Sequence, residues 1–542
     1  MNTVFKAFHA TTDRFGDKPF IHLASDTANR YGVEAGELSY EQARRKVTRL
    51  IDNYQAVPLS PGQRVALSLD NRPEAFTHWL ALNALGVSVV PINPQWKSGE
   101  LEYVFDHSEV VLAVGLSDRI ELLQAASDVT GNRARVASVS EIEALSVSGT
   151  GSEQAVDDSA DGTTECALLY TSGTTGRPKG CMLSNNYFLS TGAWYRDVGG
   201  FCSMTEGVER LLTPLPMYHM NAMATSTMCM LMTGGCIIPL DRFHPSTFWQ
   251  SVEETQPTIL HYLGVMPVML MGIESTPQER AHNIRFGFGA GLSGELHTQF
   301  EERFGFKLVE AWAMTETGCT VAVIASEAPR NVGTACFGKP GPHIDFRLVD
   351  DSGADVGVEV AGELLVRRTG ADPRFGFFSG YLKDAEATDA AWAGGYFNTG
   401  DLVRKDAEGA LHFVDRKKNV IRRSGENIAA VEVEEILLQH PAVGSVAVAA
   451  VPDKVRGDEV FAAVVTDVPE ADWQETAQDI VRYCLERLAY YKAPGYLGRV
   501  TALPLTPTEK VQRAALKELA CAMAESGDCV DTREMKTSRT IT

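Results

Sequence analysis

Residues 170–180, Tyr-Thr-Ser-Gly-Thr-Thr-Gly-Arg-Pro-Lys-Gly, are the stretch that decides the fold. The residues just before it, Cys-Ala-Leu-Leu-Tyr at 166–170, are an apolar run that predicts a buried strand. Glycine N–H groups, hydroxyls and cations such as Arg177 and Lys179 together make a cradle for phosphate groups. Because no Gly-Lys-Ser/Thr closes the loop, it is not a Walker A loop, and we expect a nucleotide-triphosphate site of another kind.

Length and charge narrow the class of protein. A chain of 542 residues is too long for one core, so we expect several domains. The formal net charge of −21 argues against nucleic acid or an anionic membrane as the main partner, whereas a phosphate ligand needs only local positive charge. Ten scattered cysteines are typical of reduced thiols in a cytoplasmic protein.

No segment of the chain is typical of a membrane anchor. Residues 1–20 lack the apolar core of a signal peptide. The most apolar window, 217–240, is interrupted by polar residues, so we expect a buried helix and strand there rather than a membrane span. Nothing in the sequence decides between a monomer and a homodimer.

Strand and helix patterns alternate over the first part of the chain. Helices are predicted at 40–53 and 72–86, and strands at 64–69 and 87–92. This alternation predicts a parallel sheet that is covered on both faces, and the same rhythm continues from 166 to about 318. Residues 136–164, rich in Ser, Gly and Asp, are expected to be a surface connection.

The pattern changes after residue 333. Short strands at 345–349, 362–367 and 411–414, punctuated by Gly and Asp, predict a small β-barrel subdomain. A compact α+β segment follows, with helices at 430–440 and 473–488 and strands at 445–451 and 460–465. We therefore divide the chain into residues 1–416, residues 417–524 and a frayed tail at 525–542.

Taken whole, the loop at 170–180 resembles that of the adenylate-forming (ANL) superfamily, which includes acyl-CoA synthetases, adenylation domains of peptide synthetases and luciferases. The resemblance extends from about residue 38 to 513. It implies an α/β fold in which the N-terminal domain has two doubly wound βαβ subdomains and a small β-barrel, followed by a mobile α+β C-terminal domain. It also implies that the loop holds the β- and γ-phosphates of ATP through Thr171, Ser172, Gly173, Thr174, Thr175 and Lys179.

Two further segments resemble the family's nucleotide site. In Ala-Trp-Ala-Met-Thr-Glu-Thr at 311–317, the resemblance implies that Trp312 stacks on adenine, Thr315 contacts phosphate, and Glu316 holds magnesium together with Thr171. The neighbouring Gly289, Ala290 and Gly291 are also assigned to the nucleotide. In Tyr-Phe-Asn-Thr-Gly-Asp at 396–401, Asp401 would bind the ribose diol, because a carboxylate accepts two hydrogen bonds. The alternatives are a helix cap at Thr315–Glu316 and a surface turn at Asp401.

The C-terminal motifs imply a second half-reaction with coenzyme A. Residues 415–428 resemble the family hinge and its glycine loop, with Arg416 on the ribose and Lys418 at the pivot. Ser424 and Gly425 would line the pantetheine tunnel. Lys510 resembles the adenylation lysine, although Glu509 stands where the family usually has Gly. The alternatives are a solvated charged face for the hinge and an idle surface position for Lys510.

The acyl side of the site is where the chain departs from the family pattern. His219 would gate the acyl pocket against the thiol, unless it is a satisfied core histidine. Phe288 replaces a common Gly or Ser and Ala313 replaces a common Gly, so we expect a pocket too small for a long chain. Met220 and Met266 are the other predicted pocket residues.

The resemblance implies an AMP-forming carboxylic acid–CoA ligase that uses ATP, Mg²⁺ and coenzyme A. Residues 285–293 and 416–431 look more like carnitine/crotonobetaine-CoA ligases than like typical fatty-acid enzymes, which favours a short or medium, polar or carnitine-like acid, or a small aromatic one. Three alternatives stay open within the fold: an adenylation enzyme that loads a carrier protein, a fatty-acid–CoA ligase, and luciferase-like oxygenation. A non-enzymatic nucleotide-binding module is disfavoured by the intact motif residues.

Overall fold

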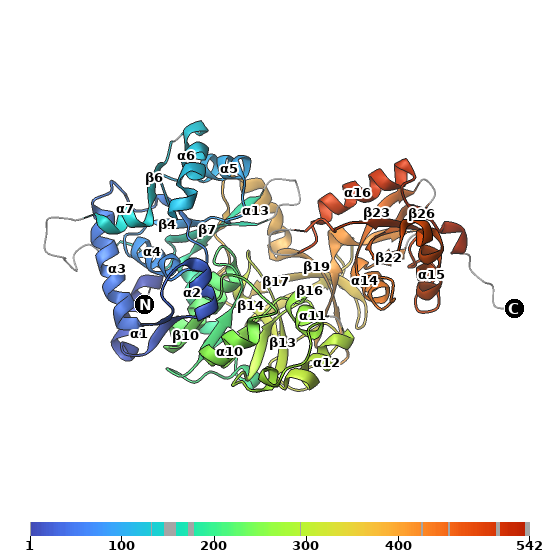
Figure 1. Cartoon of the computed structure of the whole chain (residues 1–542), viewed down its shortest axis with the longest axis horizontal. Helices are drawn as coiled ribbons and strands as arrows, with labels where there is room; N and C mark the ends of the chain where they lie inside the picture. Colours follow the sequence, from blue (N-terminus) through green and yellow to red (C-terminus); the bar gives the residue numbers. More distant parts are fainter. Residues whose placement is uncertain are drawn as a thin grey trace. The chain divides into compact units, whose positions relative to one another are not determined.

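The computed structural model describes residues 2–131, 133–145, 159–171, 178–292, 294–423, 426–453, 456–505 and 510–536 (Figure 1). The chain divides into two compact units. The first holds most residues up to 346 together with 366–397, and the second holds 347–365 and the described residues from 398 onward.

A seven-stranded sheet in the first unit carries the loop at 170–180. Its order is β18-β8-β7-β4-β3-β5-β6. The parallel strands are β3 (Arg64–Ser68), β4 (Ser88–Pro91), β5 (Leu112–Gly115), β6 (Arg135–Ser138) and β7 (Glu165–Thr171). Strands β8 (Lys179–Ser184) and β18 (Gly380–Tyr381) form an antiparallel edge. The predicted parallel sheet is therefore present.

A second sheet of eight strands, in the order β14-β13-β12-β11-β9-β10-β1-β2, has the same character. Its parallel strands are β1 (Pro19–Leu23), β9 (Arg210–Thr213), β10 (Cys236–Pro239), β11 (Ile259–His261), β12 (Phe286–Gly289) and β13 (Lys307–Met314). The edges β2 (Gly36–Ser39) and β14 (Gly318–Ile324) are antiparallel to their neighbours. In such a sheet, ligands bind at the carboxyl ends of the parallel strands.

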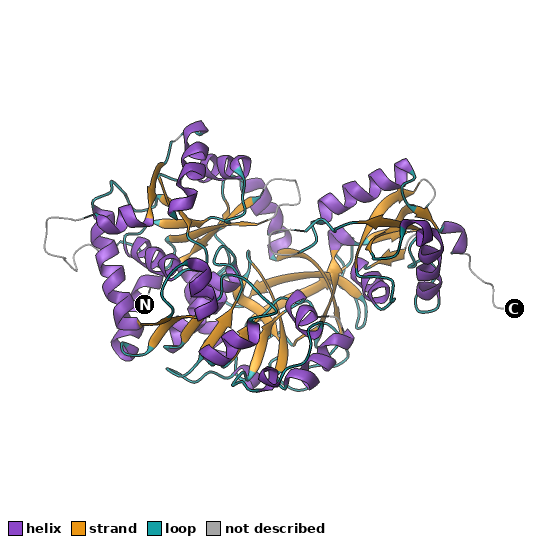
Figure 2. Ribbon diagram, viewed as in Figure 1, coloured by secondary structure: helices purple, strands orange, loops and turns teal. Residues whose placement is uncertain are grey.

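Helices cover both sheets of this unit (Figure 2). Between them pack α1 (Val4–Phe15), α4 (Pro73–Ala84), α8 (Asn185–Asp197) and α9 (Thr227–Thr233), and α8 contacts strands of both sheets, β8 and β14. The other helices are α2 (Ser25–Tyr31), α3 (Tyr40–Gln55), α5 (Ser98–Ser108), α6 (Ile120–Val129), α10 (Phe248–Thr255), α11 (Val265–Met271), α12 (Gly294–Phe304) and α13 (Ala385–Ala391). Helix α3 begins where predicted because Ser39 and Gln42 form a capping box.

Two sequence predictions in this unit meet different outcomes. Residues 136–164 were expected to be a surface connection, but they begin with the end of β6 and with α7 (Val139–Ala144). A reciprocal capping box between Ser138 and Glu141 starts this helix, and its Ser-rich sequence hid it. Residues 217–240 hold a buried helix and strand as predicted, and no described helix is both long and apolar enough to cross a membrane.

The predicted β subdomain is present as a group of short strands. Hydrogen-bonded neighbours run in the order β20-β19-β17-β16. Their bounds are β16 (Ile344–Val349), β17 (Ala361–Arg368), β19 (Phe397–Lys405) and β20 (Leu411–Arg416). Most of these residues belong to the second unit.

The C-terminal part of the second unit is the predicted α+β fold. Its sheet contains β21 (Ile421–Arg423), β22 (Glu426–Ile428), β23 (Ser445–Asp453), β24 (Gly457–Val465), β25 (Tyr496–Val500) and β26 (Val530–Asp531). Alternate residues of β23 and β24 face two cores, one with α14 (Ala430–Leu438) and α15 (Trp473–Leu485), and one with α16 (Arg513–Ser526). Burial on both faces explains why these strands are almost entirely apolar.

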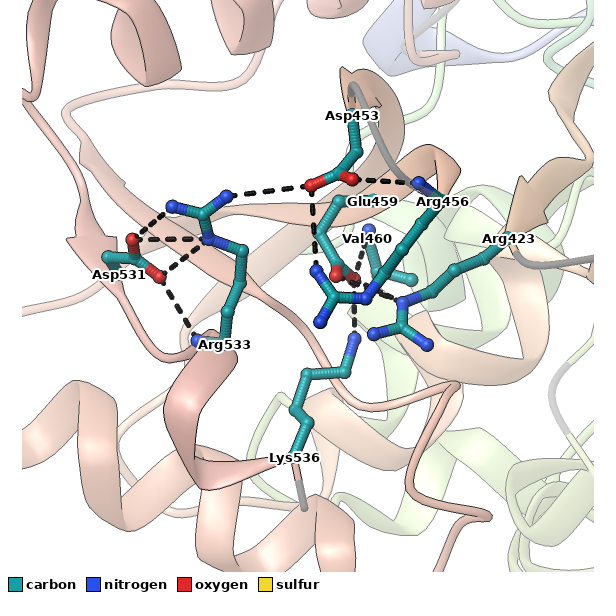
Figure 3. A network of polar contacts seen from close by, with 8 residues as sticks. All are labelled: Arg423, Asp453, Arg456, Glu459, Val460, Asp531, Arg533 and Lys536. Carbon is teal, nitrogen blue, oxygen red and sulfur yellow. Dashed lines mark hydrogen bonds and ion pairs between the residues drawn. The ribbon is translucent and has the colours of Figure 1, made fainter. Parts of the chain in front are cut away.

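Within the region expected to be a frayed tail, residues 525–536 include the end of α16 and strand β26. Strand β26 pairs with β25, and the amine of Lys536 lies 2.5 Å from Glu459 Oε1 (Figure 3). The two side chains are fully buried. The charged side chains of this segment form internal ion pairs. Its polar composition is also typical of a solvated tail, which is why the sequence alone predicted fraying.

Candidate active site

The predicted phosphate loop joins two paired strands of the first sheet. Thr171 ends β7 and Lys179 begins β8, and their Cα atoms are register partners. The predicted ligands Ser172, Gly173, Thr174 and Thr175 lie outside the described residues. The described anchors hold the two ends of the loop at the sheet edge.

Lys179 and Glu316, predicted to bind phosphate and magnesium, meet through a tyrosine that the sequence did not single out. The Lys179 amine lies 4.7 Å from the ring centroid of Tyr381 and 3.2 Å from Asp384 Oδ2. The Tyr381 hydroxyl donates a hydrogen bond of 2.9 Å to Glu316 Oε1. Burial, and then the Glu316 charge, raise the pKa of Tyr381 above its ordinary value, so the phenol stays protonated and remains a donor. A lysine and a nearly buried carboxylate therefore lie together beside the loop.

Thr315 and Glu316 occupy the turn of the β13–β14 hairpin, so the helix-cap alternative is wrong. Thr317 stabilises this turn because its fully buried hydroxyl accepts a 3.0 Å hydrogen bond from the N–H of Met314. Thr315 is half-buried and Glu316 is buried. This hairpin presents the predicted phosphate-contacting residue next to the predicted metal ligand.

The Gly289-Ala290-Gly291 segment follows β12, next to the strand that carries Trp312. Gly291 has a φ of +88°. A Cβ added to Gly264 would lie 1.8 Å from the carbonyl oxygen of Gly291, so the backbones of these two glycines are in close contact. The Glu310 carboxylate accepts a 3.0 Å hydrogen bond from the N–H of Leu292, and burial raises the Glu310 pKa. Trp312 is buried on β13. Backbone contact and an unpredicted glutamate thus shape the assigned adenine segment.

The predicted acyl residues lie near the carboxyl ends of β9, β11 and β12. His219 and Met220 are half-buried and directly precede a π-helix at Asn221–Ser226. Met266 is buried on α11, and Ala313 is half-buried on β13.

Phe288 is buried against other aromatic rings. Its ring stacks on that of His261, with centroids 4.7 Å apart, and lies 4.9 Å from that of Tyr195. Burial lowers the pKa of His261 to about 3, so this imidazole is neutral. The bulk that distinguishes Phe288 from the family residue packs against a buried histidine that the sequence reading missed.

In the second unit, the two predicted ribose ligands form an ion pair. Arg416 Nε lies 2.5 Å from Asp401 Oδ1, and the two residues are register partners on β20 and β19. The Asp401 side chain is almost fully buried, which excludes the surface-turn alternative. Desolvation, and second the Arg416 guanidinium, lower the pKa of the Lys510 amine, although much of this side chain is exposed. Lys510 thus lies within electrostatic reach of the predicted ribose pair.

The hinge region is described only in part. Lys417 lies 2.6 Å from Glu363 Oε2, and Asp415 accepts a 2.7 Å hydrogen bond from the N–H of Ala430 at the start of α14. The side chain of Lys418 and the residues Ser424 and Gly425 lie outside what the structure describes. Asp415 is an unpredicted residue that ties β20 to α14.

Comparison with known proteins identifies the family. A profile described as AMP-binding enzyme matches residues 8–382, and one described as AMP-binding enzyme C-terminal domain matches residues 432–510. The chain belongs to the AMP-binding enzyme family. The gap between the two matches, residues 383–431, contains the boundary predicted at 416/417, which stays a prediction.

Relatives of this AMP-binding enzyme include CoA ligases. A crotonobetaine/carnitine–CoA ligase of Escherichia fergusonii is 27% identical over 521 residues, covering 93% of this chain and 97% of the relative. Among solved structures, ATP-bound MatB from Rhodopseudomonas palustris has a TM-score of 0.79 at 24% identity, covering 96% and 99% of the chains. O-succinylbenzoate CoA synthetase (MenE) from Bacillus subtilis with AMP has a TM-score of 0.78 at 24% identity, covering 94% and 98%. The structural matches establish the shared fold.

Several residues of this AMP-binding enzyme's site escaped the sequence reading. They are Tyr381, Asp384, Glu310, His261 and Asp415. Each acts through a partner distant in sequence or on another element. Asp384 offered a local signal, since it is the N-cap of α13 and accepts a hydrogen bond from the N–H of Ala387.

No group of three or more His, Cys, Asp or Glu side chains that could hold a metal occurs among the residues that the structure describes.

Proposed function

We propose that the protein activates a small, polar carboxylic acid in two steps at the site assembled around Lys179, Tyr381 and Glu316. It is an AMP-forming acid–CoA ligase: the acid and ATP give an acyl-adenylate and pyrophosphate, and the thiol of coenzyme A then gives the acyl-CoA and AMP. The observation that carries the proposal is the Tyr381 bridge, which holds a lysine and a buried carboxylate beside the phosphate loop.

The first step needs positioning and charge neutralisation rather than a nucleophilic side chain. The acid is already ionised near neutral pH, and its oxygen attacks the α-phosphorus as pyrophosphate leaves. Lys179 neutralises the departing phosphates, the proposed Thr315 contact orients the α-phosphate, and Asp401 and Arg416 fix the ribose. Lys510 then stabilises the developing charge on the acid and phosphate oxygens.

Magnesium fits the residues present. Glu316 is a nearly buried carboxylate, and Mg²⁺ is usually held by one or two carboxylates together with substrate phosphates. We assign Glu316, with the hydroxyl of Thr171, to hold the ion, which when bound supplies charge neutralisation at the phosphates. Tyr381 keeps the Glu316 carboxylate in one orientation through its 2.9 Å hydrogen bond.

In the second step the thiolate attacks the acyl carbon and AMP leaves. Lys510 serves the first step and the loop of Ser424 and Gly425 serves the second, so we propose that the C-terminal domain turns about Lys418 between them. His219 gates the acyl side against the thiol. These roles follow the family resemblance, and the hydrogen bond from Ala430 N–H to Asp415 supports a defined connection at the turning point.

The acid is proposed to be short or medium in length and polar, carnitine-like or aromatic. Phe288 and Met266 are buried, which supports a pocket with little depth for a long chain. The similarity to a crotonobetaine/carnitine–CoA ligase favours the same size class. We also propose a cytoplasmic location and a homodimer, the latter to be checked by light scattering on the purified protein.

The test is a substrate panel. The protein is incubated with ATP, Mg²⁺, coenzyme A and carnitine-like, aryl, hydroxy and fatty acids, and AMP and acyl-CoA are measured. The proposal expects AMP and acyl-CoA in equal amounts with a polar or aryl acid. AMP formation that is trapped by hydroxylamine yet independent of coenzyme A would instead indicate loading of a carrier protein. Absence of turnover with every acid would indicate a binding module.

A further inference from the structure

A buried polar chain in the first unit ends at one half-buried side chain near the predicted acyl residues. The Tyr195 hydroxyl lies 2.9 Å from His261 Nε2, and His261 Nδ1 lies 2.8 Å from the side-chain oxygen of Asn221. Tyr195 and His261 are fully buried, whereas Asn221 is half-buried. The chain therefore runs from the core outward to Asn221.

The donors and acceptors of this chain have one consistent arrangement. Burial holds His261 neutral, so one ring nitrogen donates and the other accepts. The Ser226 hydroxyl, 2.8 Å from His261 Nδ1, donates to the carbonyl of Asn221. Nδ1–H therefore donates to the Asn221 side-chain oxygen, and Nε2 accepts from Tyr195.

This arrangement sets the orientation of the Asn221 amide. Because its oxygen is bound by His261, the NH₂ group faces the other side of the carboxamide. The backbone there is equally fixed, because Asn221 starts the π-helix. The hydroxyls of Ser226 and Thr227 donate hydrogen bonds of 3.0 and 2.8 Å to the backbone carbonyls five residues earlier. Such π-helical segments occur frequently at functional sites.

The location of Asn221 points to the acid. His261 is the last residue of β11 and Phe288 lies near the end of β12, while Asn221 follows β9, the other neighbour of β11. Ligands bind at these carboxyl ends in parallel sheets. Asn221 directly follows the predicted pocket residue Met220.

We propose that Asn221 is a specificity-determining residue whose amide donates a hydrogen bond to a neutral oxygen acceptor, a keto or hydroxyl oxygen, on the chain of the acid. Tyr195 and His261 are positioning residues that fix the amide. A neutral acceptor is favoured over a second carboxylate because the amide and the imidazole behind it are both uncharged. The inference rests on the proposed ligase function and names its substrate class.

The test compares acids of matched shape. Acyl-CoA formation is measured for 4-oxopentanoate against 4-methylpentanoate, for 3- and 4-hydroxy acids against their methyl analogues, and for glutarate. The wild type is expected to favour an oxygen-bearing acid in kcat/KM. Asn221→Leu is expected to reduce that preference about tenfold, since one neutral hydrogen bond is lost and the substrate oxygen is left unpaired.

Two further variants separate positioning from folding. Tyr195→Phe removes the hydroxyl behind His261 and should reduce the same preference by a smaller factor than Asn221→Leu does. Tyr54→Phe is the matched control, because Tyr54 and His78 form another buried Tyr–His pair, 2.6 Å apart, on other elements. Tyr54→Phe should leave the preference for oxygen-bearing acids unchanged even if it lowers the melting temperature as much as Tyr195→Phe does.

The outcomes are distinct. An oxygen preference that Asn221→Leu leaves within twofold of wild type overturns the inference while the ligase function stands. A wild type that prefers the methyl analogues or glutarate overturns it as well. Lack of turnover with every acid overturns the ligase function and the inference together.

Discussion

The buried ions of the C-terminal domain make a sharp prediction about stability. Glu459 is fully buried, and both its oxygens lie 2.9 Å from Arg423 Nε, while the Lys536 amine lies 2.5 Å from Oε1 (Figure 3). One anion thus faces two buried cations. Replacing Glu459 by Gln should leave both cations uncompensated and destabilise the domain by about 3–5 kcal/mol.

Replacing Lys536, the cation of the Glu459–Lys536 pair, should destabilise the domain far less than replacing Glu459. Lys536→Met removes the excess cation and leaves Arg423 paired with Glu459, so we expect a loss of at most about 1 kcal/mol. The surface pair Asp479–Arg482, at 3.3 Å with side chains 60% and 55% exposed, gives the baseline. Arg482→Gln should change stability by less than about 0.5 kcal/mol.

Native-state hydrogen exchange, followed by mass spectrometry on peptides from β23 and β24, measures the free energy of opening of this domain alone. A global melting curve would mix the two units. The reasoning is refuted if Glu459→Gln and Lys536→Met lower the opening free energy by the same amount, or if Lys536→Met is the more damaging change.

Three other predictions follow from the contacts. Burial lowers the pKa of Lys536 to about 8, so between that pH and the ordinary value of 10.5 the unfolded chain binds more protons than the folded one. The free energy of unfolding of the wild type, relative to that of Lys536→Met, should therefore rise by up to about 1.4 kcal/mol per pH unit as pH rises through this window, and fall as pH falls. Denaturant titrations of both proteins at several pH values measure this difference. Tyr381→Phe removes the donor to the Glu316 carboxylate and should lower the rate of acid-dependent ATP–pyrophosphate exchange about tenfold. Tyr396→Phe, which removes a hydroxyl bonded to Asp345, is the control. Equal exchange rates in the wild type and Tyr381→Phe would show that Glu316 does not need this hydrogen bond. Gly264→Ala places a Cβ 1.8 Å from the Gly291 oxygen and should raise the KM for ATP and lower the melting temperature, whereas Gly99→Ala, with open space around it, should do neither.

The sheets of the first unit could be predicted from local pattern. Apolar runs such as 166–170 gave β7, and helix α3 was found through its periodic apolar residues. The surface connection predicted at 136–164 was partly wrong because the capping box of Ser138 and Glu141 starts a helix within a Ser-rich segment.

The residues of the candidate site also divide into those that a local motif indicates and those that only the tertiary fold reveals. Thr315, Glu316, Asp401 and Arg416 were named from short motifs that resemble those of the family, and their roles stay predictions. Tyr381 could not be named in this way, because its hydroxyl meets Glu316 from 65 residues away through an edge strand. His261 resembled an ordinary core residue, since its polar partners come from α8 and the π-helix. Lys536 was assigned to a frayed tail because only the tertiary fold reveals Glu459.

The central claim is that the acid attacks the α-phosphorus of ATP, and one measurement tests it most directly. An accepted acid labelled with ¹⁸O in its carboxylate is converted with ATP, Mg²⁺ and unlabelled coenzyme A, and the products are analysed by mass spectrometry. The account predicts one ¹⁸O atom in AMP and none in pyrophosphate. Label in inorganic phosphate, with ADP as the nucleotide product, would contradict it.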